Sequence, residues 1–152
     1  MKRLHVHIGV SDLEKSIRYY TALFGEGPTK EERGYAKWML EEPRVNFAIS
    51  AHSAEPGINH LGMQVDSEEE LAELHARAEA ADADGLIDEG RTTCCYARSE
   101  KHWSVDPEGV AWEHFLTTGD ASEYGNSGPI EMAGKSAGTE SLRADREGCG
   151  CG

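Results

Sequence analysis

A short internal repeat is the feature that most constrains how this 152-residue chain folds. His5 and Val10 open the first copy, and His60 and Val65 open the second at an offset of 55 residues. Each opening is followed by an amphipathic helical pattern and then by strand-like stretches. Repetition at a fixed offset predicts two copies of one supersecondary unit.

Each copy continues with a predicted helix that has its own start and stop signals. The first begins near Ser11, with Glu14 at capping-box spacing, and ends at Gly25. The second begins near Ser67, again with a glutamate three residues later, and ends at Gly85. The apolar residues at helical spacing are Leu13, Ile17, Tyr20 and Phe24 in the first helix, and Leu71, Leu74, Ala78 and Ala81 in the second.

Strand-like stretches follow both predicted helices. A tight turn at 106–109, Asp-Pro-Glu-Gly, separates the last two, because Pro and Gly set its dihedral angles. The predicted strands are 35–40 and 45–50 in the first copy, and 85–88, 95–98, 102–105 and 111–116 in the second. The order of strand, helix and several strands, repeated once, predicts an α+β fold.

The last part of the chain has a different composition. Residues 119–152 are rich in Gly, Ser and acidic residues and have no sustained apolar periodicity, which predicts a disordered tail. The tail ends with Cys149 and Cys151 on either side of a glycine. We therefore expect one folded domain at 1–118, with modules at about 1–54 and 55–118.

Charge and hydropathy exclude several classes of function. The net charge of −13 argues against nucleic acids and anionic membrane surfaces, which attract basic patches. No apolar run approaches the roughly 20 residues of a membrane-spanning helix, and the first residues do not resemble a signal peptide. Four cysteines in two close pairs fit a reducing compartment better than a disulfide framework. We expect a cytoplasmic protein.

Two histidines and one glutamate form a candidate metal-ligand set. His5 and His60 occupy matching positions in the repeat, and Glu113 lies in the last predicted strand. Two imidazoles and a carboxylate can hold Fe(II) in a facial triad with open positions for substrate and oxygen. A single histidine is more often an ordinary polar residue, and the repeat is what favours a ligand role here. His7 is a rival to His5 on the same strand face, whereas His114 should point away from Glu113.

Adjacent cysteines at Cys94 and Cys95 are a second unusual feature. Two thiolates are soft donors that can hold one thiophilic centre. Neighbours in a regular strand point to opposite faces, so a shared ligand requires irregular backbone. The alternative is a pair of small buried apolar side chains, which free cysteines often are. Cys149 and Cys151 are a weaker signal of the same chemistry.

The ends of this pattern resemble a known superfamily. The first segment is His5 with 10–16, Val-Ser-Asp-Leu-Glu-Lys-Ser, and 19–20, Tyr-Tyr; the second is the turn at 106–109 followed by Trp-Glu at 112–113. Together they resemble the vicinal oxygen chelate proteins, that is, the glyoxalase, bleomycin-resistance and dioxygenase superfamily. The resemblance covers residues 1 to about 118 and implies two βαβββ modules around one divalent metal.

A narrower resemblance is carried by residues 93–96, Thr-Cys-Cys-Tyr, and by the cysteine-bearing tail. These are similar to the carbon–arsenic bond lyases of arsenic resistance, often labelled cadmium-induced proteins. The resemblance implies Fe(II) held by His5, His60 and Glu113, with dioxygen as co-substrate. It also implies that Cys94 and Cys95 bind trivalent organoarsenicals, which are converted to arsenite.

Other functions stay open from the sequence. The chain could bind a soft metal or metalloid through its cysteines without turnover. It could also be another enzyme of the superfamily, such as an isomerase acting on glutathione adducts or an extradiol dioxygenase, neither of which needs vicinal thiols. A four-ligand glyoxalase site is disfavoured because Asn46 is the nearest match to the fourth ligand, a glutamate. The preferred organic group, and closure of the site within one chain or across a homodimer, are not determined.

Overall fold

The computed structural model describes residues 1–52, 55–81, 86–94 and 97–120, with residues 92–94, 97–98 and 120 described by their backbone alone. Ten elements follow the chain in two similar groups. The first group is β1 Arg3–Gly9, α1 Leu13–Phe24, β2 Lys30–Glu32, β3 Tyr35–Glu41 and β4 Arg44–Ser50. The second is β5 Gly57–Val65, α2 Glu68–Ala80, β6 Ile87–Cys94, β7 Ala97–Val105 and β8 Ala111–Asp120.

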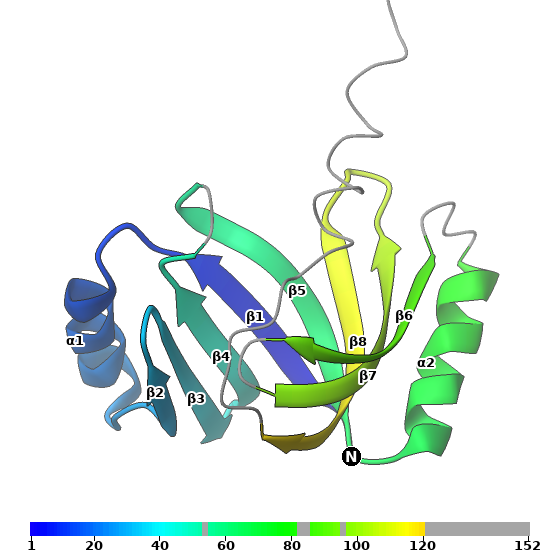
Figure 1. Cartoon of the computed structure of the whole chain (residues 1–152), viewed down its shortest axis with the longest axis horizontal. Helices are drawn as coiled ribbons and strands as arrows, with labels where there is room; N and C mark the ends of the chain where they lie inside the picture. Colours follow the sequence, from blue (N-terminus) through cyan, green and yellow to red (C-terminus); the bar gives the residue numbers. More distant parts are fainter. Residues whose placement is uncertain (53–54, 82–85, 95–96, 121–152) are drawn as a thin grey trace, which may run out of the picture.

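The eight strands form one curved sheet in the order β2-β3-β4-β1-β5-β8-β7-β6 (Figure 1). In each module the first strand pairs in parallel with the last, β1 with β4 and β5 with β8. The two modules meet where β1 pairs antiparallel with β5. This arrangement confirms the predicted α+β fold, a strand, a helix and three strands repeated once.

The helices begin and end close to the predicted positions, with one correction. The N-cap of α1 is Asp12, whose carboxylate accepts a hydrogen bond from the Lys15 amide, and not the predicted Ser11. An aspartate offers an ionised acceptor at the positive end of the helix dipole, which favours it as the cap. Gly25 ends α1 in the left-handed conformation, as predicted. Neither helix is long and apolar enough to cross a membrane.

In the second module, α2 has the predicted N-cap, Ser67, which accepts from the amide of Glu70. The helix is capped at Ala81, and the predicted stop at Gly85 lies outside the described residues. The strands after it are longer and fewer than predicted. Where the sequence indicated strands at 85–88, 95–98 and 102–105, the described residues form β6 and β7, because polar residues such as Arg91 and Glu100 pair across the ladder. Residues 85, 95 and 96 of the predicted strands lie outside the described residues. The short polar strand β2 was also missed.

Strand alternation separates the apolar core from the polar face of the sheet. In the first module, α1 covers a cluster of buried residues that includes Trp38, Phe47 and Ile49. Val6 and Ile8 of β1 pack against this cluster, so His5 and His7, which alternate with them, lie on the other face. In the second module, α2 covers a smaller core of Val65, Leu71 and Leu74. The face opposite the helices is therefore the one that carries the histidines of β1.

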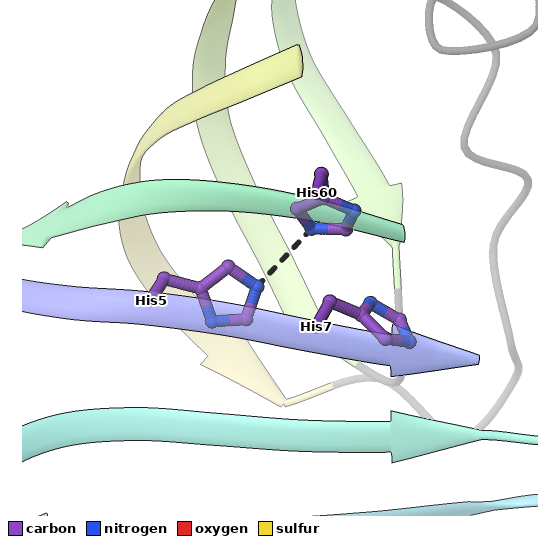
Figure 2. A group of neighbouring side chains, drawn as sticks. All are labelled: His5, His7 and His60. Carbon is purple, nitrogen blue, oxygen red and sulfur yellow. Dashed lines mark hydrogen bonds between the residues drawn. The ribbon is translucent and has the colours of Figure 1, made fainter. Parts of the chain in front are cut away.

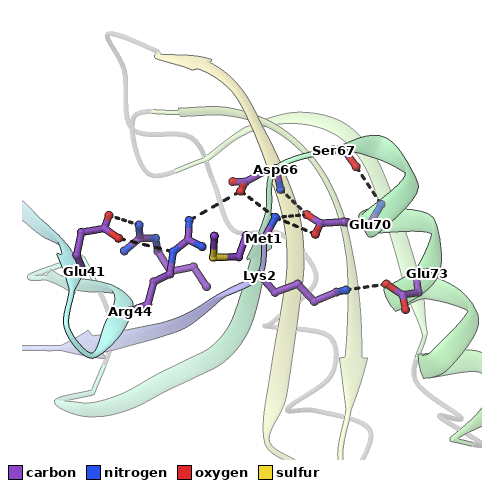
Figure 3. Close-up of polar contacts among 9 residues, drawn as sticks. Met1, Lys2, Glu41, Arg44, Asp66, Ser67, Glu70 and Glu73 are labelled. Atoms are coloured by element: carbon purple, nitrogen blue, oxygen red, sulfur yellow. Dashed lines mark hydrogen bonds and ion pairs between the residues drawn. The ribbon is translucent and has the colours of Figure 1, made fainter.

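Charged contacts connect the start of β1 to the first turns of α2 (Figure 3). The Met1 ammonium lies 3.0 Å from Asp66 and donates to Glu70, and Lys2 Nζ lies 2.6 Å from Glu73. Solvent exposure limits surface pairs of this kind to roughly 0–1 kcal/mol each. They fix the position of the chain start more than they stabilise the domain.

Candidate metal centre

Three neighbouring strands bring the predicted ligands together. His5 comes from β1, His60 from β5 and Glu113 from β8, and all three are buried. The two histidine Nε2 atoms are 3.2 Å apart (Figure 2). Glu113 Oε2 lies 3.6 Å from Nε2 of His5 and 3.4 Å from Nε2 of His60. All three residues come from a single chain.

The register of the strands explains why these residues meet. His5 pairs with Gly62 on β5, and Gly62 pairs with Glu113 on β8, so His5, Gly62 and Glu113 lie in one row across the sheet. His60 precedes Gly62 by two residues on β5, so alternation puts its side chain on the same face. A Cβ at Gly62 would lie 2.2 Å from the carbonyl oxygen of Glu113, which no side chain tolerates. The close approach of β5 and β8 therefore requires glycine at position 62. A glycine inside a strand pattern is the sequence signal for such a close approach, although Gly62 was not among the predicted site residues.

Hydrogen bonds select the tautomers of both histidines. His5 Nδ1 lies 3.0 Å from the Asn46 carbonyl oxygen, and His60 Nδ1 lies 2.7 Å from Oδ1 of Asn59. Both acceptors are oxygens, so each Nδ1 carries the proton and donates it. Burial and the neighbouring His60 lower the pKa of His5 to about 4, which leaves this ring neutral at physiological pH.

The Nε2 atoms of His5 and His60 lie 3.2 Å apart and face each other. An ion bound at this position could take one nitrogen ligand from each ring. In metal sites, the second ring nitrogen of a ligand histidine usually donates to an oxygen acceptor, and this hydrogen bond orients the ring. The residues of this site therefore fit a divalent metal ion.

Lys101 contacts the same site from β7. Its ammonium, which is buried, lies 2.6 Å from Oε1 of Glu113. Burial raises the pKa of Glu113, but Lys101 and the two histidines outweigh it and hold the pKa well below its ordinary value. One carboxylate oxygen thus pairs with the ammonium while the other faces the histidines. The sequence did not indicate this pairing, because it depends on the alignment of β7 with β8.

His7 is a competing donor in the same place. It pairs with His60 across β1 and β5, and the ligand nitrogens of His5, His7 and His60 lie within 4.8 Å of one another. His7 Nε2 contacts Ser50 Oγ at 2.9 Å, whereas its buried Nδ1 has no hydrogen-bond partner among the described residues. Its position on the face of His5 confirms the predicted alternation. His114 points to the other face, also as predicted, where it contacts Ser104.

A pocket opens beside these residues and encloses about 410 Å³, part of it open to solvent. Two lysines, Lys37 and Lys101, give it positive charge. Asn46 contributes a buried side chain whose Nδ2 donates to Gln64 and whose Oδ1 has no hydrogen-bond partner among the described residues. The lining residues are His5, His7, Tyr35, Lys37, Asn46, Ser99, Lys101, Glu113, Phe115 and Thr117.

The predicted substrate-binding cysteines lie at the limit of what the structure describes. The backbone of Cys94 ends β6 and pairs with Ala97, two residues before the pocket residue Ser99. The Cys94 side chain and all of Cys95 lie outside the described residues, as do Cys149 and Cys151. Their predicted role therefore stays a prediction.

The chain belongs to the Glyoxalase/Bleomycin resistance protein/Dioxygenase superfamily, whose sequence model matches residues 2–114. This agrees with the two-module sheet.

Several relatives have names that describe a function. A trivalent organoarsenical cleaving enzyme of Bacillus sp. (strain MD1) is 36% identical over 98% of this chain and 99% of the relative. An enzyme of the same name from Thermomonospora curvata is 36% identical over 80% of this chain and 81% of its own length. The cadmium-induced protein CadI of Mycobacterium bovis is 35% identical over 85% of this chain and 84% of its own length.

Solved structures show the same fold at low sequence identity. A Mn(II)-bound glyoxalase from Novosphingobium aromaticivorans has a TM-score of 0.58 at 19% identity, covering 81% of this chain and 42% of its own. A superfamily member from Vibrio splendidus has a TM-score of 0.54 at 14% identity, covering 77% and 99%. These similarities concern the architecture alone.

Proposed function

We propose that this protein is an Fe(II)-dependent dioxygenase that cleaves the carbon–arsenic bond of trivalent organoarsenicals and releases inorganic arsenite and an oxidised carbon fragment, with dioxygen as the oxidant. The observation that carries the proposal is the buried His5, His60 and Glu113 cluster beside a pocket, in a chain 36% identical over nearly its whole length to a named organoarsenical cleaving enzyme. Two imidazoles and one carboxylate leave coordination positions open, which a dioxygenase needs.

His5, His60 and Glu113 would hold the iron. Bound Fe(II) supplies activation of dioxygen, and the chain supplies the surroundings. Asn46 and Asn59 orient the two imidazoles through their Nδ1 protons. Lys101 keeps Glu113 ionised and occupies one of its oxygens, so that the other is directed at the histidines.

Cys94 and Cys95 would hold the arsenic. Each thiol replaces one hydroxyl on trivalent arsenic, forming an As–S bond and releasing water, so two thiols leave the organic group as the third substituent. Soft thiolates select arsenic, whereas histidine and carboxylate suit iron, so the two centres do not compete for ligands. The backbone position of Cys94 opposite Ala97, close to Ser99 of the pocket, supports this assignment.

We further propose that residues 1–118 carry this activity and that 119–152 form an accessory tail. In this proposal Cys149 and Cys151 raise capture of arsenicals at low concentration and take no part in bond cleavage. A chain that ends at residue 120 should then keep its turnover number for methylarsenite at saturating substrate.

The test is anaerobic loading with Fe(II), followed by turnover of methylarsenite in air with analysis of the arsenic products. Arsenite should form only when iron and dioxygen are present, and its formation should fall on the order of 100-fold when either cysteine is replaced. A matched control is His52→Ala, which removes an exposed histidine that contacts the Arg33 carbonyl and is not in the proposed ligand set, and which should keep full activity. Tight binding of methylarsenite without arsenite formation would instead identify a sequestering protein. Full turnover by the Cys94→Ser, Cys95→Ser double variant would exclude arsenic capture by this pair. Neither binding nor turnover of methylarsenite by the parent protein would leave another dioxygenase of the superfamily.

A further inference from the structure

A second group of histidines lies on the opposite face of the sheet, under α2. His102 on β7 and His114 on β8 are paired across the ladder, and both are buried. Their ring centroids are 4.8 Å apart, and the ring of His75, on α2, lies 4.9 Å from that of His102. Glu113 and His114 are consecutive residues with side chains on opposite faces, so this group is separate from the candidate metal centre.

Two nitrogens of this group are unsatisfied. His102 Nε2 and His114 Nδ1 are buried and have no hydrogen-bond partner among the described residues. The other nitrogen of His114, Nε2, lies 3.0 Å from Ser104 Oγ. Buried polar atoms are rarely left without partners, and such an atom calls for a specific explanation. Neither residue takes part in the function proposed above.

We propose that His75, His102 and His114 form a second metal site, for a borderline divalent cation such as Zn²⁺. Imidazole suits this class of ion. Two imidazoles bound to one tetrahedral zinc, with bonds of about 2.0–2.1 Å, have ring centroids about 5 Å apart. The observed centroid distances of 4.8 and 4.9 Å match this value, as does the 5.1 Å between His5 and His60.

The surroundings favour a neutral, oriented donor set. Burial, with His114 and His75 nearby, lowers the pKa of His102 to about 4. Ser104 Oγ can accept the Nε2 proton of His114, which leaves Nδ1 free to bind. Glu79 Oε2 lies 3.6 Å from His75 Nδ1, and Asp88 pairs with His102 across β6 and β7. These carboxylates supply negative charge that offsets a bound cation.

The three histidines can bind one ion together only if one of their side chains moves. Among the described residues, the ligand nitrogens of His75, His102 and His114 do not all lie within 4.8 Å of one another, unlike those of His5, His7 and His60. His75 is the member that can adjust, because its side chain is 35% exposed on the surface of α2. An ion bound there would connect α2 to β7 and β8. The site is therefore structural, in that it holds the helix on the sheet, and it does not face the substrate pocket.

The experiment uses full-length protein with all four cysteines replaced by serine, so that thiols do not bind the probe. Equilibrium dialysis against Zn²⁺ at pH 7.5 should give two bound equivalents. His75→Ala should bind one, and so should His102→Gln. The matched control, His52→Ala, removes an exposed histidine from the other half of the molecule and should keep both.

A second readout separates this site from the first. In a His60→Ala background, which weakens the candidate metal centre, Zn²⁺ should still raise the melting temperature by several degrees. Adding His75→Ala should abolish that rise. Because His75 is partly exposed, its replacement should not prevent folding. Two equivalents retained by His75→Ala, or an unchanged melting temperature on addition of Zn²⁺ to the His60→Ala protein, would overturn the proposal without affecting the proposed function.

Discussion

Lys101 Nζ lies 2.6 Å from Oε1 of Glu113, and both side chains are buried beside two histidines whose Nε2 atoms face each other. In the metal-free protein this ammonium is the main positive charge that Glu113 faces. A buried carboxylate without a partner costs several kcal/mol, so the lysine lets the site fold before any metal arrives. The pair also holds the carboxylate in one orientation, with Oε2 directed toward the histidines.

Lys101→Met should therefore destabilise the metal-free protein by about 3–5 kcal/mol, because it leaves an unpaired buried charge. Chemical denaturation of the metal-free protein measures the loss. The control is the double variant Lys101→Met, Glu113→Leu, which removes both charges and should be less destabilised than the sum of its single variants. Strict additivity of the two effects would show that the pair is not coupled.

Metal retention should distinguish the three predicted ligands from His7. His5→Ala, His60→Ala and Glu113→Ala should each abolish iron retention after desalting. His7→Ala should retain iron with affinity reduced by about 10–100-fold, as expected for an outer residue. Iron content by elemental analysis gives the answer, and circular dichroism checks the fold. If His7→Ala loses iron while His5→Ala keeps it, His7 is the ligand from β1.

Single replacement of either vicinal cysteine should separate iron binding from turnover. Cys94→Ser and Cys95→Ser should each keep one iron, because no thiolate is in the proposed ligand set. Turnover of methylarsenite should fall on the order of 100-fold, since one remaining thiolate cannot fix the orientation of the arsenic and small displacements are costly. Steady-state kinetics with measured iron content provides the comparison. Equal turnover by parent and variants would argue against arsenic capture by this pair.

Gly62→Ala tests the close approach of β5 and β8. The added Cβ would lie 2.2 Å from the Glu113 carbonyl oxygen, so the strands must separate and carry Glu113 away from the histidines. We expect a loss of about 1–3 kcal/mol or more in unfolding free energy, together with weaker iron binding. Gly119→Ala is the matched control, because a Cβ at that glycine of β8 meets nothing within 4 Å. Similar behaviour of the two variants would contradict the steric argument.

The stability of the metal-free protein should depend on His102 at mildly acidic pH. The pKa of His102 is lowered from 6.5 to about 4 in the folded chain. The unfolded chain therefore takes up this proton first, and the unfolding free energy falls as the pH drops from 6.5 to 4. One such residue adds a slope of at most about 1.4 kcal/mol per pH unit. His102→Gln should reduce the slope in that window, as measured by urea denaturation at several pH values.

The repeat was enough to predict the α+β architecture, because the helix signals and the histidines recur together. Alternation also placed His5 and His7 on one face and His114 on the other. Contacts that depend on register between distant strands could not be read from one sequence. Lys101 with Glu113 and Gly62 with Glu113 are of this kind. The lengths of β6 and β7 were missed because polar residues there are stabilised by their cross-strand partners and give no apolar pattern.

The antiparallel pairing of β1 with β5 places the two modules on either side of a seam that runs through the candidate metal centre. His5 belongs to one side of this seam and His60 to the other, with Val6 and Leu61 paired between them. An ion held by both histidines is thus a cross-link between the halves of the molecule, in addition to the backbone ladder. The exchange of amide hydrogens along β1 and β5 with solvent should slow when the ion binds, while amides at the outer strands β2 and β6 keep their rates. Loss of the ion should therefore open the hydrogen bonds between β1 and β5, at the centre of the sheet, before those of the edge strands.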